Sequence, residues 1–132
     1  MKQTLIALAA VSALLASPAL AIAQTAVTTD TFTAAGPTDV LSSNLIGLNV
    51  VNSQNETVGE IKDLILSQGQ LSGYILSVGG FLGMGERYVI VRPAAINIAY
   101  VDADSKWKAS MNATVDQLKA APAFTYEGRW KR

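Results

Sequence analysis

Apolar and polar residues alternate in the middle of the chain, which is the pattern of half-buried strands. In the segment Leu45–Val50, Ile46, Leu48 and Val50 would point to one side of an extended chain. Turn-forming residues fill positions 52–56. The pattern therefore predicts a first strand that ends in a turn.

The next segment, Thr57–Leu66, fits two patterns. Four apolar residues have helical spacing, namely Val58, Ile61, Leu64 and Ile65. A β-bulge at Gly59 would instead shift the alternation of a strand by one residue and place Ile61, Asp63 and Ile65 on one face. The spacing alone leaves helix and strand both open.

Four further segments have clear boundaries. Gln68–Gln70 is a compact turn signal, and Leu71–Val78 is rich in strand-forming residues, so this strand is expected to return antiparallel to the one before the turn. Gly79–Gly85 is a glycine-rich loop, and the strand Arg87–Arg92 after it is stopped by Pro93. These signals predict a hairpin followed by one more strand.

The last third of the chain contains two short strands and a helix. Ile96, Ile98 and Tyr100 alternate in a fifth strand, and the turn at 102–105 leads to a sixth strand in which Trp107 is expected to close the core. Thr114–Gln117 has capping-box spacing, which opens a short helix that runs to Ala121 and is ended by Pro122. Together the elements predict a mainly β fold, a small antiparallel barrel or sandwich of about six strands with one short C-terminal helix.

The first segment reads as an export signal. Lys2 is followed by an apolar run from Leu5 to Leu15, which is too short for a bilayer that needs about 20 residues. The small residues near Ala23 and Ala21 fit signal-peptidase cleavage after either one, with Ala23 preferred. We therefore expect a signal peptide over 1–23, a periplasmic or secreted mature chain, and a flexible Thr/Ala-rich leader over 24–43.

Composition removes several kinds of chemistry. The 132-residue chain has no Cys and no His, so thiol nucleophiles, disulfides and histidine catalysis are excluded. Ten basic residues balance ten acidic ones, so no net field favours nucleic acid as a partner. No nucleophile elbow is present either, and we expect neither enzymatic activity nor a cofactor.

Three segments resemble PRC-barrel domains. They read LIGLNV over Leu45–Val50, GEIKDL over Gly59–Leu64, and SVGGFLGMGE over Ser77–Glu86 before a Val-rich strand. The resemblance covers about 44–101, and it resolves Thr57–Leu66 as a strand. The chain looks like a stand-alone exported bacterial member. Residues 102–132 form a C-terminal extension, within which Thr114–Tyr126 is similar to the extensions of such members.

The resemblance implies a docking module with no catalytic residues. PRC-barrels of this kind hold a protein partner in the photosynthetic reaction-centre H subunit and in a ribosome-maturation factor. Function is then expected to be the binding of a protein partner, or of a second copy, through a loop or an open strand edge.

The glycine-rich loop supplies the candidate partner-binding residues. Phe81, Leu82 and Met84 would either tuck under the barrel or form an apolar loop tip that meets the partner. Phosphate binding is disfavoured because a strand, not a helix, follows the loop. Candidate structural glycines are Gly59, Gly79, Gly80, Gly83 and Gly85.

Four carboxylates motivate an alternative function, the binding of a small ligand or a divalent ion: Glu60, Asp63, Asp102 and Asp104. Asp102 and Asp104 resemble the start of a calcium loop, but Lys106 occupies the next ligand position, so solvated turn acids are favoured. No metal site is therefore predicted.

The C-terminal tail, residues 126–132, mixes aromatic residues with three cations. Such a tail either frays in solvent, which is the favoured reading, or touches an anionic membrane or acidic partner weakly. Membrane contact is expected to be peripheral at most.

Overall fold

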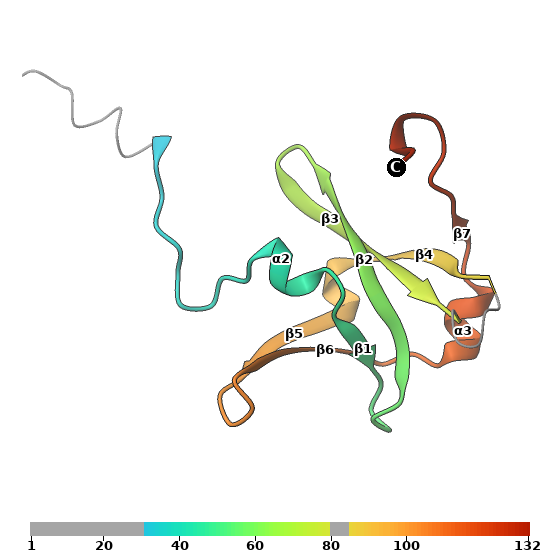
Figure 1. Ribbon diagram of the computed structural model, residues 1–132, viewed down its shortest axis with the longest axis horizontal. Coiled ribbons are helices and arrows are strands. Elements are labelled where there is room, and N and C mark those ends of the chain that lie inside the picture. The colour runs from blue at the N-terminus through green and yellow to red at the C-terminus, as the bar shows by residue number, and fades with distance from the viewer. Residues whose placement is uncertain (1–30, 80–84) are drawn as a thin grey trace, which may run out of the picture. The chain divides into compact units, whose positions relative to one another are not determined.

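The chain forms one sheet of seven strands, described over residues 31–79 and 85–132 of a computed structural model (Figure 1). The strand order is β5-β6-β1-β2-β3-β4-β7. The strands are β1 Asn49–Val51, β2 Thr57–Ser67, β3 Gln70–Val78, β4 Arg87–Val91, β5 Ile96–Val101, β6 Lys106–Met111 and β7 Ala123–Phe124. The helical elements are α2 Ser42–Leu45, η2 Pro93–Ala95, α3 Val115–Ala120 and η3 Gly128–Trp130.

The predicted mainly β fold is confirmed, but the sheet does not close. Its ends are β5 and β7, which do not pair with each other in the described part of the chain, and β1 runs parallel to β6. The sheet nevertheless curls, because Val89 and Val91 of β4 share one buried cluster with Ile96 of β5. Figure 1 shows the long β2–β3 hairpin running across the β5–β6 hairpin. A curled open sheet therefore replaces the expected antiparallel barrel.

The core lies on one face of this sheet. Its fully buried side chains are Val50, Val58, Ile61, Leu76, Val78 and Val89. Full burial of an aliphatic side chain of this size stabilises a fold by about 1.5–3 kcal/mol. Since these six residues come from β1, β2, β3 and β4, the fully buried part of the core depends on the first four strands of the chain.

The β2–β3 hairpin forms as the sequence predicts. Gln68 and Gly69 make its two-residue turn with φ of 52° and 77°, the pair of positive values that a type I′ turn requires. Strands β2 and β3 pair antiparallel from Ser67–Gln70 back to Glu60–Ser77. The segment Thr57–Leu66 is thus a strand, as the family resemblance implies.

Strand β2 has an irregularity next to Gly59, where Val58 has no Cα partner in β1, and another at Lys62 facing β3. The predicted bulge near Gly59 is therefore present, but the predicted placement of Ile61, Asp63 and Ile65 on one face is wrong. Ile61 is opposite Leu76 and Asp63 is opposite Ile75, which leaves Lys62 without an opposing residue in the ladder. Ile61 consequently faces the core, whereas Asp63 faces the other side of the sheet. Sequence alternation could not place the bulge at Lys62, because the position is set by the partner strand.

The first element also differs from the prediction. Leu45 ends the short helix α2 and is buried, while Ile46 is exposed and the strand begins only at Asn49. Gly47 turns the chain with φ of 89°, a value that favours glycine. Val40, within the expected leader, packs against the core. The turn at Gly47 lets both Leu45 and Val50 reach the core, which a continuous strand would not allow.

The C-terminal part contains one confirmed signal and two surprises. The side chain of Thr114 accepts from the Gln117 N–H and the Gln117 side chain accepts from the Thr114 N–H, so the predicted capping box opens α3. Strand β7, which was not predicted, pairs Phe124 with Tyr88 of β4. Trp107 is half-buried and meets Tyr100 edge-on at 5.3 Å, outside the core cluster, so its expected core-closing role is wrong.

Gly59→Ala tests the close approach of β2 to β3. An added Cβ would lie 3.0 Å from the backbone oxygen of Ser77, which forces the paired strands apart. We expect a loss of about 1–3 kcal/mol in the free energy of unfolding, measured by urea denaturation. The control, Gly85→Ala, adds a Cβ with nothing within 4 Å and should stay within about 0.5 kcal/mol of wild type. Equal midpoints for the two variants would contradict the strand spacing.

Candidate functional site

A groove of about 620 Å³ lies on the sheet face opposite the core, over β2, β3 and β4. Its floor is apolar, because Ile75 of β3 pairs with Ile90 of β4 and both line the groove together with Ile65 of β2. Val89 and Val91, on either side of Ile90, face the core instead. The central strands are therefore apolar on both faces, and the second face needs its own cover.

Two bulges shape this floor. The Lys62 bulge turns Asp63 into the groove, and a second irregularity leaves Ser72 of β3 unopposed between the Ile65–Gly73 and Leu66–Leu71 pairs. Bulges bend and twist a strand pair locally. The hairpin end that carries Leu66 thus forms one rim of the groove rather than continuing the flat sheet.

Aromatic residues of the C-terminal tail form the opposite wall. Phe124 of β7 and Tyr126 meet edge-on at 5.1 Å, and Tyr126 meets Tyr88 of β4 in the same geometry at 5.1 Å. Trp130 of η3 lies 5.9 Å from Phe124. Edge-to-face pairs at these separations are favourable for aromatic rings. The ring contacts connect the tail to the sheet through Tyr88.

Arg132 fixes the tail at one end of the groove. Its Nη2 donates to the Lys62 carbonyl at 3.2 Å, to Asp63 Oδ2 at 3.4 Å and to the Tyr126 hydroxyl at 2.8 Å. The guanidinium also stands 4.1 Å above the Tyr126 ring, a cation–π contact. The expectation of a frayed terminus is therefore wrong, since the tail folds back onto β2.

The aromatic wall is uncharged near neutral pH. Burial raises the pKa of the Tyr126 hydroxyl, although the neighbouring Arg132 acts in the opposite direction. The hydrogen bond from Tyr88 to Glu86, 2.6 Å long, is the main cause that raises the pKa of Tyr88. Asp63 and Arg132 are the charged residues among those that line the groove. The groove is thus an apolar trough with one ion pair at its end.

The rim of the groove is open to solvent. Leu66 is 68% exposed, Trp130 61% and Ile90 49%. Single exposed apolar residues are common, but three around one apolar trough form a contiguous patch of the kind that marks a binding surface. The uncovered trough as a whole, rather than any single exposed residue, is therefore the candidate binding surface.

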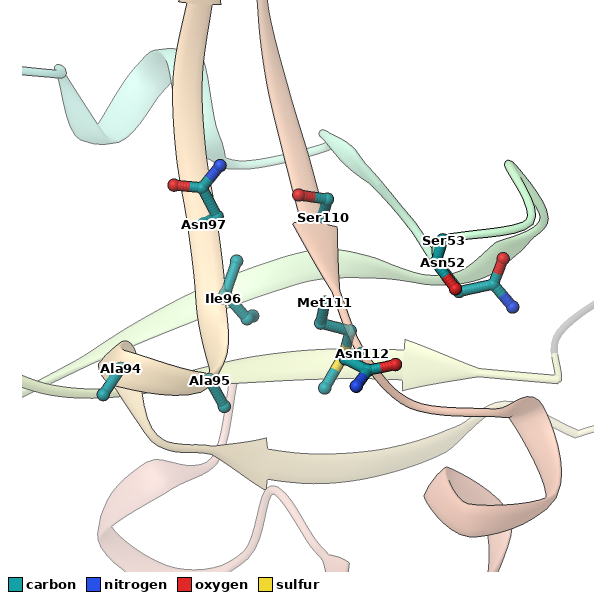
Figure 2. A pocket seen from close by; sticks show the side chains of 9 residues that line it. All are labelled: Asn52, Ser53, Ala94, Ala95, Ile96, Asn97, Ser110, Met111 and Asn112. Carbon is teal, nitrogen blue, oxygen red and sulfur yellow. The ribbon is translucent and has the colours of Figure 1, made fainter.

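A second, more polar hollow of about 380 Å³ lies where the β1–β2 turn, the start of β5 and the end of β6 meet (Figure 2). Asn97 and Ser110 face each other across β5 and β6, and Asn52 contributes from the turn. The Asn52 Oδ1 already accepts the N–H groups of Gln54 and Glu56 at 3.0 Å each. No titratable side chain lines this hollow, so its lining residues offer no acid–base chemistry.

The four candidate carboxylates do not gather into a site. Glu60 contacts Lys62 at 3.2 Å and Asp104 contacts Lys108 at 2.5 Å, while Asp63 contacts Arg132. The hydrogen bond from Lys108 is the main cause that lowers the pKa of Asp104. No group of three or more potential metal ligands occurs within residues 31–79 and 85–132. Glu60, Asp63 and Asp104 form separate surface ion pairs instead.

The proposed loop site lies largely beyond the described residues. Phe81, Leu82 and Met84, with Gly80 and Gly83, fall outside them. Gly79 has φ of 77°, and an added Cβ there would meet the Lys119 side chain at 3.4 Å. Gly85 is exposed with open space around it. Partner binding by the loop tip stays a prediction.

The sequence did contain one signal for the groove. Phe124 and Tyr126 alternate directly after Pro122, which is the spacing of an extended segment with one apolar face. This alternation of Phe124 and Tyr126 would predict that the tail joins the sheet. Nothing local indicated that Arg132 reaches Lys62 and Asp63, because those contacts join residues about 70 positions apart.

Arg132→Ala tests the attachment of the tail. The variant loses the contacts to Asp63, Lys62 and Tyr126, so hydrogen exchange over residues 123–132 should accelerate and Trp130 emission should shift to the red. Global stability should fall by no more than about 1 kcal/mol, since the ion pair is half-exposed. Arg129→Ala, an exposed neighbour in η3, should change neither signal. Equal behaviour of the two variants would refute the anchoring role.

Comparison with known proteins agrees with the fold. No helix within the described residues has the length and apolarity to span a membrane. No curated protein matches the chain. A family model, the PRC-barrel domain, matches residues 37–107, which is more than half of the 132 residues. PRC-barrels are domains of the interaction type rather than catalysts. On this match and the mainly β sheet, the chain belongs to the PRC-barrel domain family.

Proposed function

We propose that the protein is a non-enzymatic interaction module that binds a segment of another protein in the groove over β2, β3 and β4. The observation that carries this proposal is the open apolar trough with Leu66, Ile90 and Trp130 exposed around it. Burial of such side chains by a partner would supply hydrophobic binding energy at little structural cost, because the floor and wall already exist.

The charges around the groove favour a partner segment that combines bulky apolar residues with an acidic one. The tail carries Arg129, Lys131 and Arg132 against a single acid, Glu127. The hydrogen bonds of the Arg132 guanidinium all leave from Nη2 within the described chain, so the N–H groups of Nη1 can donate to a carboxylate of the partner. The partner would place its apolar side chains over Ile75 and Ile90 and its acid beside Arg132.

Several observations support a non-enzymatic role. The whole sequence has neither Cys nor His. Three of the four carboxylates that motivated ion binding, Glu60, Asp63 and Asp104, are paired with three separate cations in the described parts of the chain. Beside the ion pair of Asp63 with Arg132, the lining residues of the groove offer the hydroxyl groups of Ser72 and Tyr126 but no thiol, imidazole or amine that could act as an activated nucleophile or its base. These features fit a protein that recognises a partner rather than one that turns over a substrate.

Peptide selection with Leu66→Asp as counter-selection tests the groove. A displayed library of random peptides, selected on the wild-type protein, should yield binders with apolar anchors and an acid. These peptides should lose at least about tenfold in affinity on Leu66→Asp, since a charge on the rim opposes apolar contact. Isothermal titration of the selected synthetic peptides measures the effect.

Leu41→Asp is the matched control. Leu41 is 64% exposed, close to the 68% of Leu66, but it lies outside the residues that line the groove. Both variants should unfold within about 0.5 kcal/mol of wild type, as exposed sites usually do. Peptides that bind both variants alike, or a selection that returns no apolar consensus, would exclude the groove as the docking surface.

Export is the second part of the proposal, and it is supported by the charged start, apolar run and small-residue cleavage pattern of 1–23. Expression in a bacterial host followed by fractionation and intact-mass measurement tests it. We expect the protein outside the cytoplasm with Gln24 as its first residue, or Ile22 if cleavage follows Ala21. A full-length chain recovered from the cytoplasm would contradict export.

A further inference from the structure

The sheet has one long open edge, strand β5. In the described residues β5 pairs only with β6, over six consecutive residue pairs without a register shift. An edge strand presents a row of backbone N–H and C=O groups that can pair with another chain. The opposite edge is different, because β7 spans only two residues. The capacity for further pairing is thus concentrated on β5.

The usual protections of an edge are missing from β5. The stretch 93–101 contains no charged residue, and its proline, Pro93, precedes the strand rather than interrupting it. No bulge twists the strand away from a neighbour. Natural sheets discourage pairing at their edges with charges, prolines or bulges, so a regular, uncharged edge of six residues (about 20 Å) is suited to pairing.

We propose that β5 pairs antiparallel with β5 of a second copy of this chain, about a twofold axis through Ala99. A twofold axis perpendicular to the sheet keeps the same faces of both copies together, so Ile98 lies opposite Tyr100 of the second copy. Both copies would bring the same charges to the shared strand pair, and a charge close to Ala99 would lie near its own copy across the axis, which destabilises a strand pair. The absence of charged residues over 93–101 removes that cost for self-pairing.

Exposed aromatic surface supports this register. Tyr100 is 47% exposed although it belongs to the same strand face as Ile96 and Ile98. It packs edge-on against Trp107 of β6, beyond the buried cluster. Pairing about Ala99 would cover Tyr100 with the half-buried Ile98 of the second copy. The same contact occurs twice in the symmetric dimer, once on each side of the axis.

Single cysteines test the pairing and its register in the whole chain, which contains no Cys of its own. Residues directly opposite in an antiparallel pair have Cβ atoms about 4.5–5.5 Å apart, so Ala99→Cys should form a disulfide-linked dimer under mild oxidation. Asn97→Cys lies on the same strand and face but four residues from its counterpart, and should crosslink far more slowly. Ser53→Cys, exposed in the β1–β2 turn, gives the rate of random encounter.

Sedimentation of the uncrosslinked protein completes the test. Wild type should show a concentration-dependent dimer across a dilution series from about 1 mM to about 1 μM, and Ala99→Lys should be monomeric with an unchanged circular dichroism spectrum. A monomeric wild type at every concentration, or Ala99→Cys crosslinking no faster than Ser53→Cys, would overturn the proposal. Fast crosslinking of Asn97→Cys with slow Ala99→Cys would overturn the register.

The two proposals can fail separately, because they use different strands. Leu66→Asp should abolish peptide binding and leave the dimer intact, whereas Ala99→Lys should abolish the dimer and leave peptide affinity within about twofold. A variant that changes both readouts would contradict the separation of groove and edge.

Discussion

The two-sided apolar character of the β2–β3 hairpin governs this structure. One face of the hairpin supplies Ile61 and Leu76 to the core, and the other supplies Ile65 and Ile75 to the groove. The bulge at Lys62 makes this division possible, because it turns Asp63 and Ile65, which would otherwise share the core face with Ile61, toward the groove. A sheet that is apolar on both faces must be covered twice. The curl of the sheet provides one cover, and the C-terminal tail provides part of the other.

The parts of the fold that local signals determine could be predicted from the sequence. The Gln68–Gly69 turn, the strand stopped before Pro93, and the Thr114 capping box all depend on residues within a few positions of one another. The parts that failed depend on distant partners. The Lys62 bulge is defined against β3, and the position of Arg132 is defined against β2. Helix α2 was not predicted because Gly47, where the chain turns after the helix, also fits within an alternating strand.

Most of the groove residues could not be predicted from the sequence, because their positions also depend on distant partners. Phe124 and Trp130 become one wall only when η3 folds back, and neither has a distinctive local motif. Asp63 was noticed as a carboxylate, but its role as a tail contact follows from geometry. The family match identifies a domain of the interaction type. It does not indicate which surface a partner would use, because the cover and charge of the tail and of the open edge belong to this chain.

Strand β1 has a consequence for how the protein reaches its native state. It is only three residues long and lies between β2, its neighbour in sequence, and β6, whose Ala109 is the Cα partner of Val50. Val50 and Ala109 are 59 positions apart in the sequence, the difference between 109 and 50. Contacts between residues so far apart slow folding, since a large loop must close before they form. A nascent chain that ended before β6 would leave the middle of the sheet with an exposed ladder, so completion of the sheet has to wait until nearly all of the polypeptide has been made.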